Sequence, residues 1–174
     1  MDSRDILTIK GLIRRGEART ASSYNNIPLD RVHFLDLPFY ETGKIQKNPI
    51  SEADVEIVRN LLREIKPHQI FVAGDLADPH GTHRVCTDAV FAAVDLEKEE
   101  GAKWLKDCRI WMYRGAWAEW EIENIEMAVP ISPEELRAKR NSILKHQSQM
   151  ESAPFLGNDE RLFWQRSEDR NRGT

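Results

Sequence analysis

The chain has 174 residues, of which 40% are hydrophobic and 31% are charged, and its formal net charge at pH 7 is -4. This length and composition are typical of one globular domain and not of a disordered or repetitive protein. The basic residues alternate with acidic ones and form no positive stripe, so we expect no nucleic-acid partner.

Cysteine usage and hydropathy indicate the compartment. Cys86 and Cys108 are the two cysteines of the chain, and their spacing fits neither a zinc finger nor a secreted disulfide scaffold. No apolar run approaches the roughly 20 residues of a membrane span, and the first residues lack the apolar centre of a secretory signal. We therefore predict a cytoplasmic protein without a membrane partner.

The first half of the chain predicts a helix, a strand and a second helix. Apolar residues at helical spacing predict a helix over 3–24, with Ser3 or Asp2 as its N-cap. Residues 31–38 alternate in the manner of a strand that ends at a proline. A serine cap followed by acidic residues predicts a helix over 51–66, which Pro67 ends.

The second half continues the alternation. Residues 68–74 form a nearly continuous apolar run, which predicts a strand buried on both faces in the centre of a parallel sheet. The remaining predicted elements are a helix over 83–101, a strand over 108–115, a helix over 132–150 capped by Ser132 with Pro133 at its first position, and a helical start to the charged tail 158–174.

The alternation predicts an α/β fold with a mostly parallel sheet flanked by helices. Ligands bind such sheets beyond the carboxyl ends of the strands. A domain that starts with a helix and offers three strands is short of one or two, so we expect it to lack its N-terminal strand or strands.

The loop "GDLADPHGTH" at 74–83 follows the central strand and carries candidate site residues. His80 and His83 can bind zinc or hydrogen-bond a developing oxyanion, and Asp78 can orient His80. The alternative is that the same loop only supplies turn and cap chemistry, with histidines that tolerate solvent. The spacing alone leaves both interpretations open.

The loop resembles the Asp-x-His-x-Asp-His motif of the LmbE-like, or PIG-L, N-acetylglucosaminide deacetylases, which are zinc-dependent hydrolases with a Rossmann-like fold. "RRGEA" at 14–18, "HFLDLPFYETG" at 33–43 and "KRNSILKHQSQ" at 139–149 resemble further segments of this family in the same order. Other segments resemble the deacetylase-like region that follows a glucosamine-6-phosphate deaminase domain in a bacterial two-domain protein; they are 31–43, 65–71, 73–83, 113–122 and 127–132.

The resemblance implies that residues 1–150 are the C-terminal portion of one deacetylase domain and that 151–174 are its charged extension. It implies de-N-acetylation of an N-acetylated amino sugar, with an upstream part of the same polypeptide as partner. The alternative is a non-catalytic accessory module of a glucosamine-6-phosphate deaminase.

Residue roles follow from the same resemblance. In the loop, His83 matches the zinc ligand, His80 matches the histidine that stabilises the oxyanion, and Asp78 matches the acid that starts the motif. Arg14 matches an arginine of the sugar site. Thr82 stands where the family usually has an aspartate. The family's His-Pro-Asp-Asp motif, which supplies two more zinc ligands and the general base, does not occur in the chain. We expect those groups upstream, and for this chain alone weak zinc binding and no turnover.

Two neighbouring features have open interpretations. Trp111, Trp117, Trp120 and Tyr113 can form a sugar-stacking platform, although packing is the interpretation we favour for strand-borne aromatics. Cys86 follows His83 by three residues and can approach a metal, but we interpret it as a small buried residue.

Overall fold

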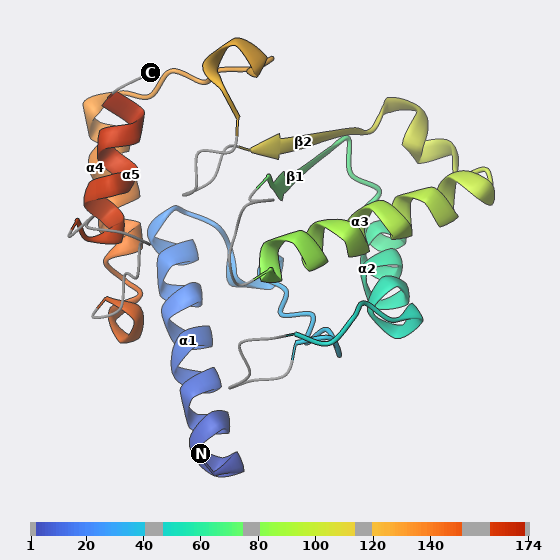
Figure 1. Cartoon of the computed structure of the whole chain (residues 1–174), viewed down its shortest axis with the longest axis horizontal. Helices are drawn as coiled ribbons and strands as arrows, with labels where there is room; N and C mark the ends of the chain where they lie inside the picture. The colour runs from blue at the N-terminus through green and yellow to red at the C-terminus, as the bar shows by residue number, and fades with distance from the viewer. Residues whose placement is uncertain (1–2, 41–46, 75–80, 114–119, 151–160, 173–174) are drawn as a thin grey trace. The chain divides into compact units, whose positions relative to one another are not determined.

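The computed structural model describes residues 3–40, 47–74, 81–113, 120–150 and 161–172. The chain forms two compact units: residues 35–121, here called the sheet unit, and residues 1–34 with 122–174, here called the helical unit. Helices and a parallel strand pair occur together, so the structure is mixed helix and strand and is compatible with the predicted α/β class (Figure 1). Within the described ranges, no helix is both long and apolar enough to cross a membrane.

The sheet unit is built around two parallel strands joined by a helix. β1 (Gln69–Ala73) pairs in parallel with β2 (Arg109–Tyr113), so that the first residues and the last residues of the two strands lie opposite each other. The connection is α3 (Thr82–Glu99), followed by a short 3₁₀ turn, Lys103–Asp107. Parallel strands require such a crossover, and the predicted order of strand, helix and strand is confirmed.

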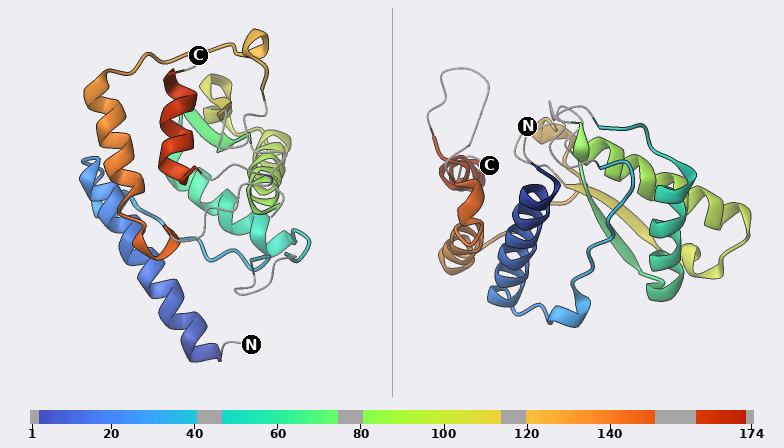
Figure 2. Two further views of the ribbon diagram at one scale, coloured as in Figure 1. Left: turned by 60° about the vertical axis from the view of Figure 1, so that its left-hand side comes forward. Right: turned by 90° about the horizontal axis from the view of Figure 1, so that it is seen from below.

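The core of the sheet unit lies between α3 and α2 (Glu52–Ile65), which pack side by side (Figures 1 and 2). Each helix contributes two core residues that are four positions apart and therefore share one face. These residues are Val58 and Leu62 of α2 and Ala89 and Ala93 of α3. Because the two alanines are small, α3 can approach α2 closely.

α2 begins and ends where its sequence predicts. Ser51 caps the N-terminus: its side chain accepts a hydrogen bond from the Asp54 backbone N–H, and the Asp54 carboxylate accepts one from the Ser51 backbone. Lys66 adopts the left-handed conformation directly before Pro67, which ends the helix. Local signals therefore determine both ends of this element.

The helical unit contains three helices and several short turns among its described residues. α1 (Arg4–Tyr24) starts at the predicted cap Ser3, and α4 (Pro133–Ile143) starts with a capping box between Ser132 and Glu135. α4 is shorter than predicted, because the chain turns after Ile143 and forms a 3₁₀ turn at Gln147–Gln149. The tail contains α5 (Phe163–Arg172), which agrees with its predicted helical start.

Two predictions about strands are wrong. Residues 31–38 form no strand: a 3₁₀ turn covers Leu29–Arg31, and Asp36 has a positive φ of 50°, which interrupts an extended chain. β1 is not buried on both faces, since Phe71 is 56% exposed. Ile70 packs against the core between α2 and α3, whereas Phe71, on the other face of the strand, is not part of this core.

Gly74, directly after β1, has no room for a side chain. A Cβ there would lie 2.7 Å from Trp120 Nε1 and 2.8 Å from the backbone oxygen of Tyr113. We expect Gly74→Ala to lower the free energy of unfolding by about 2 kcal/mol, because backbone and indole must move. Gly11→Ala, in the interior of α1 with open space around it, should instead raise it by about 0.5 kcal/mol. Urea unfolding measures the stability of both variants, and equal midpoints would contradict the steric clash expected at residue 74.

Candidate functional site

The carboxyl ends of both strands and the start of α3 meet at one place. The Gly74 N–H donates to the Tyr113 carbonyl oxygen at 3.0 Å, which continues the parallel ladder beyond β1. The Thr87 hydroxyl, in the second turn of α3, donates to the Ala73 carbonyl oxygen at 2.9 Å. The first turns of α3 are therefore fixed to the end of β1, and residues 75–80 connect the two.

Gly81 is the residue at which the chain enters α3. It has a φ of 68°, in the left-handed region that a glycine adopts without strain. Thr82 and His83 follow as the first two residues of the helix. This geometry explains the glycine in the loop motif and places His83 in the first turn.

The predicted site residues have different outcomes. His83 is exposed in the first turn of α3, at the carboxyl end of β1, where the sequence predicts it. Asp78 and His80 lie outside the described residues, so their roles stay predictions. Arg14 is exposed on α1 and belongs to the helical unit, whereas His83 belongs to the sheet unit.

A catalytic zinc needs about three protein ligands and one open position. Among the described residues, no group of three or more His, Cys, Asp or Glu side chains can hold a metal ion. The His83 imidazole is a suitable donor at the candidate site. The described residues thus provide a single donor of the right chemistry there, and the two other loop candidates are Asp78 and His80.

Cys86 is a poor addition to this donor set. It is exposed on α3, so its interpretation as a buried residue is wrong. Desolvation by the surrounding protein, together with the Asp54 carboxylate, raises the pKa of its thiol. Since the thiolate is the form that binds metal, a raised pKa disfavours a ligand role.

The aromatic residues near the strand ends differ in exposure. Trp111 and Trp120 are half-buried, and the indole nitrogen of each is buried without a hydrogen-bond partner among the described residues. Tyr113 is 50% exposed at the end of β2, and Trp117 lies outside the described residues. The favoured packing interpretation therefore agrees with the positions of Trp111 and Trp120.

Two segments that carry the resemblance contact each other in the helical unit. The Glu17 carboxylate of α1 accepts hydrogen bonds from the Ser148 backbone N–H at 2.6 Å and from its hydroxyl at 2.7 Å. Burial raises the pKa of Glu17, but these hydrogen bonds and the nearby His146 and Arg14 outweigh it, so the pKa is lowered. Sequence reasoning missed this contact, because Glu17 and Ser148 are 131 positions apart.

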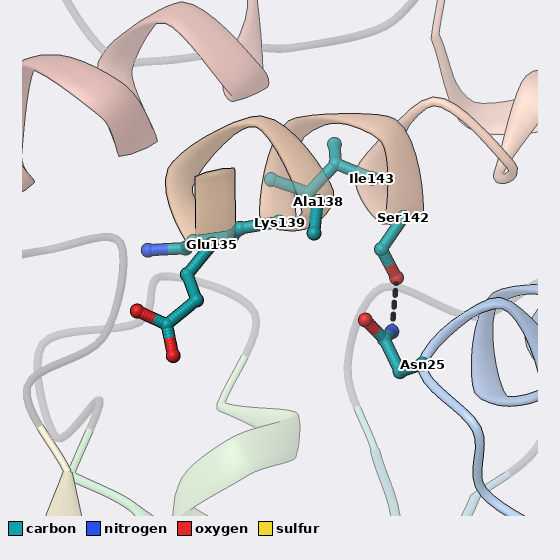
Figure 3. A pocket seen from close by; sticks show the side chains of 6 residues that line it. All are labelled: Asn25, Glu135, Ala138, Lys139, Ser142 and Ile143. Atoms are coloured by element: carbon teal, nitrogen blue, oxygen red, sulfur yellow. Dashed lines mark hydrogen bonds between the residues drawn. The ribbon is translucent and has the colours of Figure 1, made fainter. Parts of the chain in front are cut away.

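The helical unit also has a surface pocket of about 320 Å³, formed by α4 and the C-terminal end of α1 (Figure 3). Lys139 in this pocket donates to the Asn171 side chain at 2.6 Å, and burial and Arg170 lower its pKa. The lining residues are Asn25, Glu135, Ala138, Lys139, Ser142 and Ile143. None of them is a predicted catalytic, substrate or metal residue.

The described residues thus place an imidazole at the carboxyl end of a parallel strand pair, next to a loop rich in polar side chains. No protein-family model matches the chain, and neither does any solved structure.

Proposed function

We propose that the chain is the C-terminal part of a Rossmann-like, zinc-dependent hydrolase domain that removes the acetyl group from an N-acetylated amino sugar. One observation carries the proposal. The loop 74–83 leaves the carboxyl end of β1 in a parallel strand, helix and strand arrangement, and ligands bind α/β sheets at such ends. The loop sequence offers two histidines and two aspartates at this place.

Each loop residue has a role in amide hydrolysis. His83 would hold the zinc ion, which supplies Lewis acidity toward water and the acetyl carbonyl. His80 would donate a hydrogen bond to the oxygen that gains negative charge when water attacks the acetyl carbon. Asp78 would orient His80. The C–N bond then breaks, and acetate and the amino sugar leave.

The remaining groups of the proposed site come from elsewhere. Arg14 would hold a polar or phosphorylated part of the sugar, as the resemblance implies. The proton acceptor for the water and two further zinc ligands would come from an upstream part of the same polypeptide. The proposed domain is then complete only together with that part.

Zinc binding by the 174-residue chain tests the role of His83. We expect weak binding, measured by competition with a chromophoric chelator at pH 7, which His83→Ala reduces at least about tenfold. His68→Ala is the matched control, because His68 is also exposed but lies before β1, at the opposite end of the strand. Binding that is indifferent to His83, or equally sensitive to His68, would rule out the proposed ligand.

Acetate release tests the activity. The chain alone should release none from N-acetylglucosamine, because the proposed base is missing from it. The full-length polypeptide should release acetate, and His80→Ala should abolish the release. A zinc-free full-length protein, or release that is independent of His80, would contradict the enzyme and favour the accessory module of an amino-sugar deaminase.

A further inference from the structure

α1 packs one face within the helical unit and leaves a different, apolar face exposed. The packed face consists mainly of small or polar residues, half-buried or buried: Leu7, Arg15, Ala18, Ala21 and Ser22. The other face carries four large aliphatic residues, here called the α1 stripe: Ile6 at 44% exposure, Ile9 at 56%, Leu12 at 62% and Ile13 at 48%. Helical spacing places these four side chains next to one another.

No described element of the helical unit covers the α1 stripe. Arg15 and Arg19 lie over the Phe34 ring, and α1 packs against α4 and the turn Gln147–Gln149. The N-terminal half of α1, which carries the stripe, extends past α4 within this unit (Figures 1 and 2). A contiguous exposed apolar surface of this kind is typical of an interaction site.

We propose that the α1 stripe binds the α1 stripe of a second copy of this chain, with the two helices antiparallel. In this arrangement Ile9 of each copy faces Ile13 of the other, and the two Leu12 side chains meet near the two-fold axis. Ile6 faces Gly16, which offers open space, since no heavy atom outside the helix lies within 4 Å of the point that a Cβ would occupy. The pair removes eight large aliphatic side chains from water, four from each copy.

Charge complementarity selects the antiparallel second copy. Asp5 and Arg19 lie on the same flank of the stripe, two heptads apart. An antiparallel pair places Asp5 of each copy beside Arg19 of the other, which gives two ion pairs. In a parallel pair, this flank of one copy lies on the opposite side of the interface from the same flank of the other, so Asp5 and Arg19 do not meet. Exposed ion pairs are weak, so these pairs set orientation, while the aliphatic contacts supply the affinity.

Sedimentation equilibrium of the 174-residue chain tests the dimer. We expect a reversible monomer–dimer equilibrium that Ile9→Glu weakens at least about a hundredfold, because it buries unpaired carboxylates. Thr8→Glu is the matched control: it adds the same charge one position away, outside the stripe, and should leave the dimer intact. Circular dichroism verifies that both variants keep their helices.

A charge exchange tests the orientation. Asp5→Arg and Arg19→Asp should each weaken the dimer severalfold, and the double variant should recover most of the loss. A wild-type chain that is monomeric at all concentrations overturns the proposal and leaves the stripe to a different polypeptide. A dimer that survives Ile9→Glu, or a double variant weaker than both single variants, also overturns it.

Discussion

Replacing Asp54 by alanine is expected to lower the free energy of unfolding of the sheet unit by about 4 kcal/mol. Asp54 is fully buried, and its carboxylate joins two segments of the chain. One oxygen accepts from the Phe39 backbone N–H at 2.8 Å, and the other accepts from the backbone N–H and the hydroxyl of Ser51 at 2.8 and 2.5 Å. Alanine leaves these donors buried without an acceptor.

The contribution of Asp54 depends on pH. Burial raises its pKa, but hydrogen bonds from Ser51 and Phe39 outweigh burial, so the pKa is lowered in the folded chain. Its stabilisation is therefore complete above the unfolded pKa of about 3.9 and is lost as the pH falls through the lower, folded pKa. The difference between wild type and Asp54→Ala should be largest near neutral pH and shrink in acid.

Urea unfolding followed by tryptophan fluorescence measures this effect, since Trp104 and Trp111 lie in the same unit as Asp54. Glu52→Gln is the matched control. It removes a carboxylate from the same first turn of α2, but Glu52 is exposed, and we expect a change below about 0.5 kcal/mol. Similar losses in the two variants would show that charge at the helix start, and not the buried hydrogen bonds, is responsible.

Asp54 also illustrates what local sequence can predict. The serine cap and the early acids of α2 predict its start, because both partners of the capping box lie within three residues. The bond from Phe39 to the same carboxylate spans 15 positions and depends on the path of the preceding loop. The start of α2 is therefore predictable from local sequence, whereas the hydrogen bond that holds the preceding loop to α2 is not.

The strands likewise separate features that local sequence predicts from features that depend on distant contacts. Residues 68–74 and 108–115 predict strands correctly, because each is a short apolar run, and the two pair in parallel. Residues 31–38 have a suitable alternation but no strand partner among the described residues, and strand formation depends on such non-local pairing. The prediction that β1 is buried on both faces is wrong for a related reason: the burial of Phe71 depends on which distant segments of the chain pack beside it.

The candidate site is predictable in position and not in composition. The order of elements places the loop at a carboxyl strand end, and the structure places His83 there. The roles proposed for Asp78, His80 and Arg14 rest on the resemblance, because residue types and spacing alone also fit a turn. The Thr87 hydroxyl that fixes α3 to Ala73 has no sequence signal, since a threonine within a helix is ordinary.

Removing the Glu97 carboxylate is expected to cost about 3 kcal/mol of unfolding free energy. Glu97 lies on α3 with a side chain that is 4% exposed, and one of its oxygens accepts from Arg59 Nε and from Arg63 Nε, each at 2.6 Å. Both arginines belong to α2, so the carboxylate joins the two core helices by charge-assisted hydrogen bonds. Glu97→Gln keeps the shape and leaves the Arg59 guanidinium without this counter-ion.

The matched control is Glu56→Gln, because Glu56 pairs with the same Arg59 at 3.6 Å but is 49% exposed. Loss of this exposed ion pair in Glu56→Gln should change the unfolding free energy by less than about 0.5 kcal/mol, as is typical of exposed pairs. Urea unfolding at pH 7 compares the two variants. An effect of Glu97→Gln as small as that of Glu56→Gln would contradict a stabilising role for the buried hydrogen bonds between Glu97 and the two arginines.

The pH dependence of the unfolding free energy shows whether the charge of Glu97 or only its packing stabilises the contact between α2 and α3. Burial raises the pKa of Glu97, but the hydrogen bonds from Arg59 and Arg63 outweigh burial and lower it. Its stabilisation is therefore present above the unfolded pKa of about 4.3 and is lost as the pH falls through the lower, folded value. The stability gap between wild type and Glu97→Gln should close as the solution is acidified below about pH 4. A gap that stays constant down to about pH 2 would mean that packing of the side chain, and not its charge, holds α2 to α3.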